Sequence, residues 1–373
     1  MKGGTEYFST LVQMIDSANA SIHLQTYIFD EDETGKMVAD CLANAAQRGV
    51  QVYLLVDSFA SRQLSDGFIE MLKNAGVHFA YFKPVFSTHD FYIGRRLHHK
   101  IIVVDAQKCM VAGINISNRY NDMPDHPAWM DWAIWTEGES AKQLTEICIF
   151  VWNKSVHNDF IVDNPIQHTT SQVKENCAVK IMRNDWIHRN TEITKKYLEQ
   201  FGNAKQKVIL MTGYFWPSKR LLRKIAGAVR CGAEVNLILT GISDVPFAKA
   251  AERYTYHWLL CRGVRIFEYQ GNILHGKIAV FDKEEVNAGS YNINNISARA
   301  SVELNLLIKN DTFATNTDET LQEIINNNCK EITLEDFNLK VNLLKRFNRW
   351  FAYTLIHLLF FAFTFYFRQE HKD

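Results

Sequence analysis

The sequence predicts an α/β protein made of two similar lobes. Helical and strand patterns alternate along both halves of the chain, and one short motif occurs twice with the same internal spacing. At 373 residues the chain is also longer than most single cores grow. A composition of 47% hydrophobic and 22% charged residues is typical of a folded protein and excludes a mainly disordered one. We therefore expect a mostly parallel or mixed sheet in each lobe, covered by helices on both faces.

The first half begins with a helix that leads into a strand. Apolar residues at helical spacing predict a helix over residues 8–18, and β-branched and aromatic residues predict a strand over residues 21–29. Glycines then end two further helices, each followed by an apolar strand. The predicted helices span 36–48 and 66–74, and the strands after them span 50–56 and 77–82.

The second half repeats this order of elements. It predicts strands over 207–215, 234–239 and 264–269, and helices over 219–229 and 249–260. The glycine stops recur as well, since Arg48-Gly49-Val50 resembles Cys231-Gly232-Ala233 and Ala75-Gly76-Val77 resembles Arg262-Gly263-Val264. We infer an internal repeat. A last strand over 303–308 and helical stretches over 318–330 and 334–342 complete the pattern.

The domain boundaries follow from the repeat and from a polar stretch between its copies. Residues 158–176 contain Pro165 and several Ser, Thr and Gln residues, which predicts a linker. We expect lobes over 1–157 and 177–345, and a C-terminal membrane-associating helix over 346–373.

The duplicated motif combines His, Lys and Asp at the start and end of a short apolar run. On a strand, residues two apart share a face, so the His and the Lys point the same way while His99 points the other way. An Asn follows each copy after a turn of small residues. The motif residues are His98, Lys100 and Asp105, then His275, Lys277 and Asp282, and the two amides are Asn115 and Asn292.

This set of side chains suits a phosphodiester substrate. If both copies meet in one cleft, one neutral His can attack phosphorus to give a phosphohistidine, and the other can protonate the leaving alkoxide and then act as a base. The lysines, Asn115 and Asn292 would bind the non-bridging oxygens. This chemistry needs no metal and no cofactor, and the sequence has no carboxylate cluster typical of a Mg²⁺ or Ca²⁺ site.

Carboxylates are expected in two different roles. The motif aspartates lie roughly 20 Å from their histidines on a straight strand, which predicts structural anchors. Triad logic calls for other carboxylates to orient the imidazoles. We expect Asp131 to orient His98 and Glu303 to orient His275.

Charge and cysteine content limit the partners and the compartment. Forty-one basic and forty-one acidic residues cancel, so no nucleic-acid partner is expected. Seven scattered cysteines show neither metal-ligand nor disulfide spacing, which indicates reduced thiols in a cytosol-facing protein. The polar N-terminus has no signal-peptide pattern, so export by that route is not expected.

The C-terminus contains a nearly continuous apolar and aromatic run over residues 350–367. About 18 residues at ~1.5 Å each reach roughly 27 Å, close to a hydrocarbon thickness of about 30 Å. Lys and Arg residues flank the run, more of them before it than after it. We expect it to span the cell membrane or to dock deeply in its interface, with the catalytic part on the cytoplasmic side. The alternative is a terminal core helix.

The twice-repeated His-x-Lys-x(4)-Asp pattern resembles that of the phospholipase D superfamily, over about residues 5–345. The resemblance implies a two-lobed α/β sandwich about a pseudo-two-fold axis with one shared active site. It also implies metal-free phosphatidyl or phosphodiester transfer, with His98 as the nucleophile and His275 as the acid and base. Further stretches are similar to bacterial cardiolipin synthases: Thr26-Tyr27-Ile28-Phe29, Ala112-Gly113-Ile114-Asn115-Ile116-Ser117, Trp129-Met130-Asp131 and Tyr214-Phe215-Trp216-Pro217. Gln25, Met130 and Gly213 depart from that group, which often has Glu, Arg and Pro there.

The expected function is that of a membrane-bound phosphatidyltransferase of cardiolipin-synthase type. The donor would be phosphatidylglycerol or another phospholipid, and the acceptor a lipid or glycerol hydroxyl. Two alternatives remain open: a phospholipase D hydrolase or nuclease of the same superfamily, and a non-catalytic membrane scaffold. The neutral net charge disfavours a nuclease, the apolar tail favours lipid, and two intact motifs disfavour a scaffold.

Overall fold

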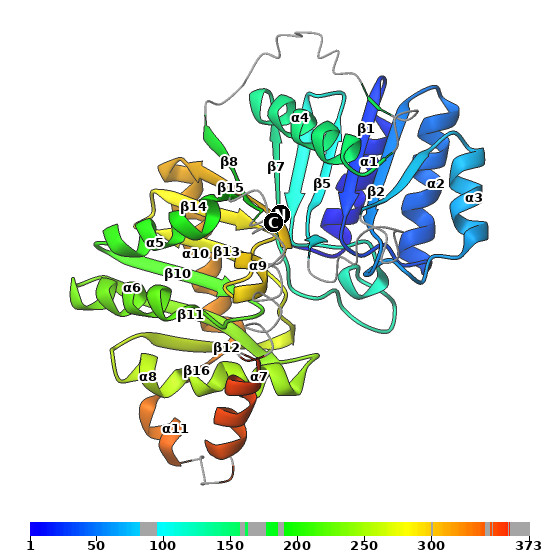
Figure 1. The fold of residues 1–373 in the computed structure, drawn as a ribbon. Helices are drawn as coiled ribbons and strands as arrows, with labels where there is room; N and C mark the ends of the chain where they lie inside the picture. Colours follow the sequence, from blue (N-terminus) through cyan, green and yellow to red (C-terminus); the bar gives the residue numbers. More distant parts are fainter. Residues whose placement is uncertain are drawn as a thin grey trace, which may run out of the picture. The chain divides into compact units, whose positions relative to one another are not determined.

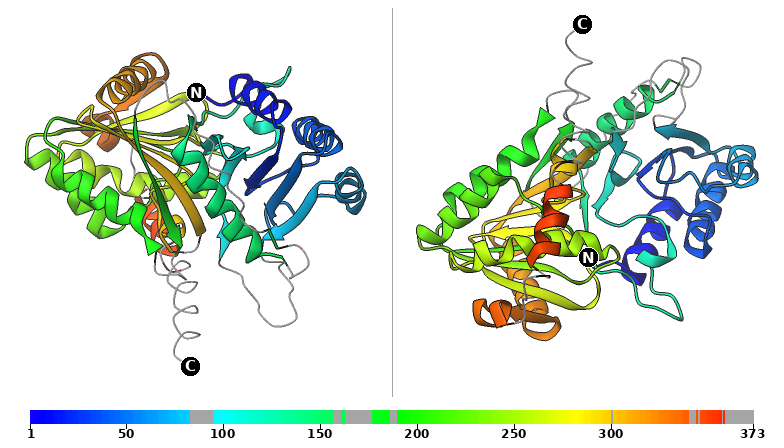
Figure 2. Two further views of the ribbon diagram at one scale, coloured as in Figure 1. Left: turned by 90° about the horizontal axis from the view of Figure 1, so that it is seen from above. Right: turned by 60° about the horizontal axis from the view of Figure 1, so that its bottom comes forward.

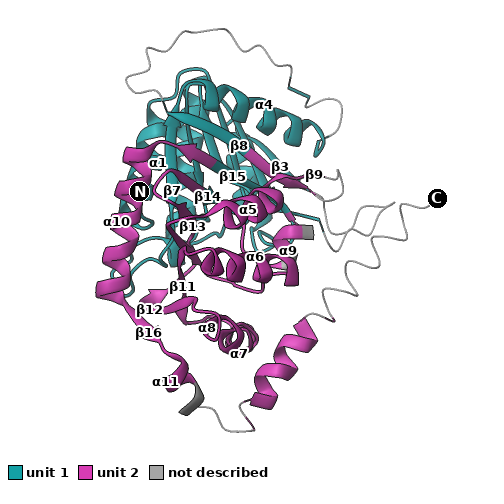
Figure 3. Cartoon of the chain, turned by 90° about the vertical axis from the view of Figure 1, so that its left-hand side faces the viewer, with its two compact units in different colours: residues 1–181, 288–290, 302–306 teal, residues 182–287, 291–301, 307–373 magenta. Residues whose placement is uncertain are grey.

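The computed structural model divides into two compact units (Figure 3). Unit 1 comprises Met1–Ile181, Ala288–Ser290 and Val302–Leu306, and unit 2 comprises Met182–Asn287, Tyr291–Ser301 and Leu307–Asp373. Two short segments from late in the chain thus belong to the first unit. The structure describes residues 1–82, 95–156, 161–162, 177–185, 190–299, 301–339, 344, 346–356 and 358. Apart from residues 161 and 162, the expected linker lies outside the described residues.

Unit 1 contains a six-stranded mixed sheet in the order β3-β2-β1-β5-β6-β7 (Figure 1). The first three strands in this order are parallel, and the last three are joined by antiparallel pairs, as is β1 to β5. A mixed sheet was expected. The strands are β1 (Ser21–Thr26), β2 (Gln51–Asp57), β3 (His78–Phe82), β5 (Lys100–Val104), β6 (Lys108–Ala112) and β7 (Ala133–Glu137).

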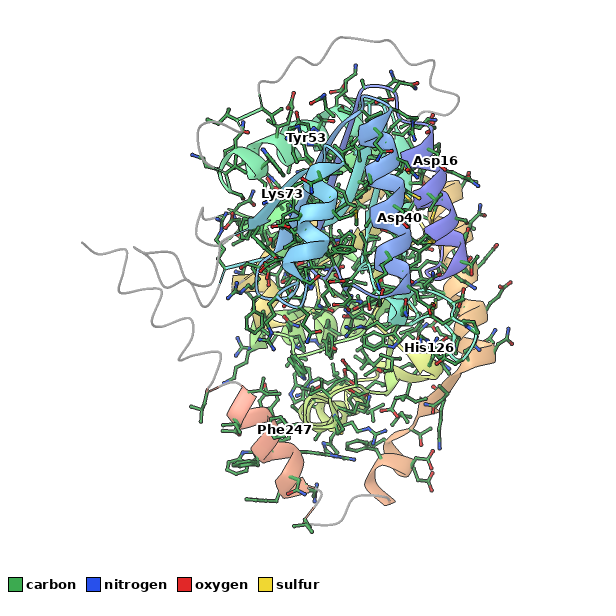
Figure 4. The ribbon with its side chains drawn as sticks, turned by 90° about the vertical axis from the view of Figure 1, so that its right-hand side faces the viewer. Asp16, Asp40, Tyr53, Lys73, His126 and Phe247 are labelled. Carbon is green, nitrogen blue, oxygen red and sulfur yellow. The ribbon has the colours of Figure 1, made fainter. Side chains whose placement is uncertain are left out.

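Helices cover both faces of this sheet. The helices α1 (Thr5–Asp16), α2 (Glu33–Gln47) and α3 (Asp66–Asn74) lie on one face, and α4 (Glu139–Asn153) lies on the other (Figures 1 and 2). Alternate residues of β2 face these two layers, since Leu54 packs in the core with α1–α3 and Leu55 packs with Trp152 of α4. Charged residues such as Asp40 of α2 and Lys73 of α3 stay exposed (Figure 4). Burial of both faces explains the nearly continuous apolar runs of the strands.

The predicted helix ends have clear local causes. Asp32 caps α2 by accepting a hydrogen bond from the backbone N–H of Gly35, and Ser65 caps α3 in the same way. Gly49 and Gly232 follow their helices with φ angles of 91° and 99°, a region in which side chains other than Gly are strained. The two halves therefore use the same stop signal, as the repeat predicts.

Unit 2 has parallel strands β10, β11 and β12, with β13 antiparallel to β10. These strands are part of a ten-stranded sheet in the order β16-β12-β11-β10-β13-β14-β15-β8-β9, and the short β4 pairs with β15. The strands are β4 (Arg96–Leu97), β8 (Ala178–Asp185), β9 (Asn190–Thr191), β10 (Lys207–Thr212), β11 (Glu234–Ile242), β12 (Arg265–Ile273), β13 (Lys277–Phe281), β14 (Glu285–Gly289), β15 (Ser301–Lys309) and β16 (Cys329–Ile332).

The helices of unit 2 differ from the expectation in several places, and the helix expected over 318–330 runs instead from Asp311 to Asn328, before β16. The helix expected over 249–260 is two helices, α7 (Pro246–Tyr254) and α8 (Tyr256–Leu260). The amphipathic helix α5 (Glu192–Asn203), like α4 in unit 1, was not predicted. The remaining helical elements are α6 (Lys219–Arg230), α9 (Asn295–Arg299), α10 (Asp311–Asn328), α11 (Leu334–Leu339) and, in unit 1, the short η1 (Asn118–Tyr120).

The expected C-terminal membrane helix is described only in part. Residues 346–356 are helical, and 359–373 lie outside the described residues. Ala352 is buried against Trp216, Ala248 and Ala251, so this helix packs on α7 within unit 2. Among the residues that the structure describes, no helix combines the length and apolarity needed to cross a bilayer.

Candidate active site

His98 lies between β4 and β5 and is held by residues from late in the chain. Its backbone N–H donates to the carbonyl oxygen of Val302 at 3.0 Å. Its Nδ1 lies 2.9 Å from Oε2 of Glu303 and 3.1 Å from the carbonyl oxygen of Ser290, so Nδ1–H donates to these two acceptors. All of these residues belong to unit 1. With the proton on Nδ1, the neutral ring keeps a lone pair on Nε2, which is what a nucleophile requires.

Glu303 is a buried carboxylate that stays ionised beside this histidine. Burial alone would raise its pKa, but the charge and hydrogen bond of His98, the hydroxyl of Ser290 and the charge of Lys100 outweigh burial, so the net pKa is lowered. Glu303 is 0% exposed and the His98 side chain is 14% exposed. This is the geometry of a base-orienting carboxylate.

The expected pairing of carboxylates with histidines is wrong for Glu303, which faces His98 and was assigned to His275. The reason is topological, because Val302–Leu306 belongs to unit 1 together with β4 and His98. Nδ1 of His98 donates to Glu303, the carboxylate that was expected to orient His275. Asp131 is fully buried, and its Oδ1 accepts a hydrogen bond from the backbone of Trp132 at 2.8 Å. Its role as a histidine-orienting residue stays a prediction.

Lys100 is buried on the same side of the strand as His98. Its Nζ donates to the carbonyl oxygen of His98 at 2.9 Å and lies 5.2 Å from the ring centroid of Tyr27. The Tyr27 ring meets His98 edge-on at 4.9 Å, and burial, then Asp57, raises the pKa of Tyr27 to about 12. The neutral ring of Tyr27 therefore lies against both the Lys100 ammonium and the His98 imidazole.

His99 faces the opposite side of the sheet, as strand alternation predicts. It is fully buried, and its Nδ1–H donates to Oε1 of Gln25 at 3.1 Å. The amide of Gln25 in turn donates to the carbonyl oxygen of Cys148 on α4. Gln25, which stands where cardiolipin synthases often have Glu, therefore supports the first motif strand from the face of the sheet that α4 covers.

Asp57 positions the motif and was not found from the sequence. It ends β2, and its Oδ2 accepts a hydrogen bond from the backbone N–H of Leu97, next to His98, at 2.9 Å. Its Oδ1 accepts from the backbone of Phe59 and Ala60. Burial raises the pKa of Asp57, partly offset by these bonds and by Arg96. A carboxylate that directly ends a buried apolar strand was the available signal.

Asn115 presents a hydrogen-bond donor near the first motif strand. Its Oδ1 accepts from the backbone N–H of Ile28 at 3.1 Å, and its Nδ2 is buried without a partner among the described residues. A buried, unsatisfied donor is costly unless a ligand accepts from it. This supports the expected contact with a phosphate oxygen.

The second half site is built on β13. Lys277 is buried, and its Nζ lies 2.8 Å from Nδ1 of His275 and also contacts the carbonyl oxygen of His275. The ring of Tyr214 meets His275 edge-on at 6.3 Å. Each half site therefore carries a buried Lys two residues after its His, and a Tyr ring beside that His.

Asn292 is buried in a tight turn after β14. Its backbone N–H donates to Oγ of Ser297, and its Oδ1 has no partner among the described residues. Its expected role in phosphate binding stays a prediction.

The motif aspartates act as anchors, at the ends of their strands. Asp105 accepts from the backbone N–H groups of Asn19, Ala20 and Ser21. Asp282 does the same in unit 2, accepting from Lys205, Gln206 and Lys207. Both have positive φ angles, 53° and 52°. The motif groups both aspartates with the catalytic residues. Their hydrogen bonds, however, hold backbone N–H groups and are structural.

Comparison with known proteins agrees with this picture. The chain matches the model of the family described as "Cardiolipin synthase, PLD-like domain" over residues 11–146 and 197–325. Cardiolipin synthase B of Salmonella typhimurium is 33% identical over 351 residues, covering 89% of this chain and 81% of that protein. The Escherichia coli K12 protein of the same name is 30% identical over 336 residues, with the same coverage. The major cardiolipin synthase ClsA of Bacillus subtilis is 29% identical, covering 86% of this chain and 67% of its own length.

Solved structures show the same fold at lower sequence identity. A phosphatidylserine synthase of Haemophilus influenzae matches with a TM-score of 0.73 at 17% identity, covering 95% of this chain and 93% of that chain. A polyphosphate kinase from Porphyromonas gingivalis matches with a TM-score of 0.60 at 14% identity, covering 89% and 47%.

Together with the two-lobed α/β fold, these matches define an enzyme of the phospholipase D superfamily, of the phosphatidyltransferase type. Within that superfamily the chain belongs to the cardiolipin synthase, PLD-like family.

Proposed function

We propose that this enzyme transfers a phosphatidyl group from phosphatidylglycerol, or another phospholipid, to a lipid or glycerol hydroxyl through a phosphohistidine. The observation that carries the mechanism is His98 held by ionised Glu303 with a lone pair left on Nε2. The donor and acceptor classes are supported by relatives named cardiolipin synthases.

In the first step, Nε2 of His98 attacks the phosphorus of the donor. The new P–N bond forms as the P–O bond to the departing glycerol breaks, and His275 gives its proton to that alkoxide. Glu303 stabilises the positive charge that develops on the His98 ring. Lys100, Lys277 and the amide of Asn115 stabilise the charge on the non-bridging oxygens.

The second step reverses the roles around phosphorus. His275, now neutral, takes the proton of the acceptor hydroxyl as its oxygen attacks the phosphohistidine. The P–N bond breaks and His98 returns to its starting state. We propose that both half sites act on one phosphodiester about the pseudo-two-fold axis, because this sequence needs two histidines and each half site holds one. No metal takes part in these steps.

We also propose that the protein works at the cell membrane, with its catalytic part on the cytoplasmic side. Support comes from the apolar composition of residues 350–367 and from the basic residues before them.

Lipid analysis in cells that lack their own cardiolipin tests this function. Wild type should produce cardiolipin, whereas His98→Ala and His275→Ala should not. Accumulation of phosphatidic acid in place of cardiolipin would identify a phospholipase D hydrolase. Cardiolipin made by either variant would contradict the two-histidine mechanism.

A further inference from the structure

Unit 2 contains a basic pocket that the proposed chemistry does not use. The cavity has a volume of about 800 Å³ and lies between α6, α7, α8, α11 and the helix 346–356. Among the described residues that line it there is no Asp or Glu. Its basic lining residues are Lys219, Arg223, Arg253, His257, Arg346 and Arg349. None of them belongs to the His-x-Lys motifs.

Arg349 has a guanidinium nitrogen without a partner among the described residues of this pocket. Its guanidinium lies 4.6 Å from the ring centroid of Phe337, and its Nη1 is buried without a partner among the described residues. Burial, followed by the charge of Arg253, lowers the pKa of Arg349. Arg253 itself is paired with Glu268 at 2.6 Å. An anion that accepts from Arg349 would offset the cost of this half-buried cation and its buried Nη1.

The wall of the pocket that carries Arg346 and Arg349 also carries an exposed aromatic face. Phe347, Trp350 and Phe351 are 55%, 47% and 49% exposed, and their rings pack 5.7 Å and 6.3 Å apart. They lie at i, i+3 and i+4, so they form one stripe on the helix 346–356. Phe247 of the neighbouring α7 is exposed as well (Figure 4). Exposed aromatics beside clustered cations are typical of a surface that enters a membrane interface.

Packed side chains connect the helix 346–356 to the second half site. Ala352 is buried against Trp216, and Tyr214 packs at the edge of this cluster. The Tyr214 ring lies 5.7 Å from the Trp216 ring and 6.3 Å from that of His275. Two aromatic side chains therefore separate the helix that lines the pocket from a motif histidine of the same unit.

We propose that this pocket binds the phosphate of an anionic phospholipid headgroup while the aromatic stripe Phe347, Trp350 and Phe351 enters the membrane interface. The cations match the charge of the headgroup, and the exposed rings require an apolar partner that a soluble phosphate lacks. Bound in this way, the membrane surface is held close to the His275 half site. This lipid site is distinct from the one that carries out the transfer.

Vesicle co-sedimentation of the full chain tests the proposal. The measurements use a His98→Ala background, so that binding is read without turnover and does not depend on the proposed reaction. Vesicles of phosphatidylcholine alone are compared with vesicles that also contain phosphatidylglycerol. Each Lys or Arg near an anionic membrane contributes about a fivefold gain in binding, so Arg346→Gln/Arg349→Gln should weaken binding to the phosphatidylglycerol vesicles by roughly twentyfold.

The matched control removes the same charge elsewhere on unit 2. Arg230 and Lys330 are exposed and lie outside the pocket lining, so Arg230→Gln/Lys330→Gln should bind within about twofold of the parent, since screening weakens isolated surface charges. Thermal unfolding checks that each variant is folded. If Arg346→Gln/Arg349→Gln does not fold, Lys219→Gln/Arg223→Gln on the exposed side of α6 takes its place. Equal losses in the pocket and control variants would overturn the proposal.

A further experiment distinguishes a lipid headgroup from a soluble phosphate as the occupant of the pocket. Soluble glycerol phosphate should not displace the protein from phosphatidylglycerol vesicles at concentrations that leave the ionic strength unchanged. Full displacement would make the occupant a soluble phosphate and would overturn the membrane assignment. Trp350→Ser should also weaken vesicle binding, and unchanged binding would contradict the role of the aromatic stripe.

Discussion

The proposed chemistry depends most on the hydrogen bond of 2.9 Å between Nδ1 of His98 and Oε2 of Glu303. Glu303→Gln keeps the shape of the side chain but removes the charge that stabilises the imidazolium. We expect kcat to fall by about 10²- to 10⁴-fold, with KM changed much less. Steady-state kinetics on phosphatidylglycerol measures this. Glu137→Gln, an exposed carboxylate of unit 1, is the matched control and should keep full activity.

The same carboxylate predicts a pH dependence of stability. Because the folded state lowers the pKa of Glu303, its stabilising effect is complete above the ordinary carboxyl value of 4.5 and is lost as the pH falls through the lowered value. Wild type should therefore lose stability toward acid more steeply than Glu303→Gln. Chemical unfolding at a series of pH values measures the two slopes. Parallel slopes would mean that Glu303 is not held as an ion in the folded protein.

The motif aspartates should matter for stability more than for chemistry. Asp105→Ala removes the acceptor of three backbone N–H groups and leaves Ala at a φ of 53°. We expect a loss of about 2–3 kcal/mol in the free energy of unfolding, and roughly half of that for Asp105→Asn. Denaturant unfolding, with exposed Asp40→Ala as the control, provides the measurement. A loss of kcat in Asp105→Asn without a loss of stability would indicate a catalytic role instead.

For single residues, the sequence predicted which side chains belong to the candidate site better than it predicted which of them contact each other. His98, Lys100 and the anchoring role of Asp105 were predicted from spacing along one strand, and Asn115 from the turn of small residues before it, which is local information. The partner of Glu303 did not follow, because the neighbours of the segment Val302–Leu306 depend on long-range strand pairing.

Among the elements, the turn between β10 and α6 brings the backbone of Gly213 into close contact with the second motif. A Cβ added at Gly213 would lie 2.5 Å from the carbonyl oxygen of Leu274 and 3.0 Å from Cα of His275. Gly213→Ala should therefore displace His275, lowering kcat by about 10-fold or more and stability by about 1–3 kcal/mol. Gly227→Ala on α6, where the nearest atom is 3.9 Å away, should be harmless. Activity equal in both variants would show that this close approach is unimportant.

Element order was predictable because both halves use the same local signals. Helical stripes, apolar strand runs and glycine stops gave the order of strands and helices around both motifs. The helices α4 and α5 were missed. The helices α7 and α8 were predicted as one helix, because the helical pattern of the sequence continues across Thr255, which separates them in the structure.

For the whole molecule, the described part of the C-terminal segment serves two purposes. Ala352 completes a small core with Trp216, while the aromatic stripe stays exposed. Deleting residues 349–373 should move the protein from the membrane to the soluble fraction after cell lysis. Deleting only 359–373, which keeps the helix 346–356, separates the contribution of the stripe from that of the segment beyond it. An unchanged membrane fraction after the longer deletion would contradict membrane association through this segment.

The two-lobed arrangement was predictable from the repeat, whereas the assignment of two late segments to unit 1 was not. Unit 1 takes Ala288–Ser290 and Val302–Leu306 from the second half, and these segments supply Ser290 and Glu303 to His98. A repeat predicts similar lobes and carries no information about which late segments join the first of them.

The central claim is that His98 is the nucleophile, and the covalent intermediate tests it most directly. The enzyme is mixed with phosphatidylglycerol, quenched in base, where phosphohistidine survives, and digested for peptide mass spectrometry. We predict a phosphatidyl adduct on the peptide that contains His98 in the wild type, and none on that peptide in His98→Ala. An adduct on His275, or product formation by His98→Ala, would contradict the assignment.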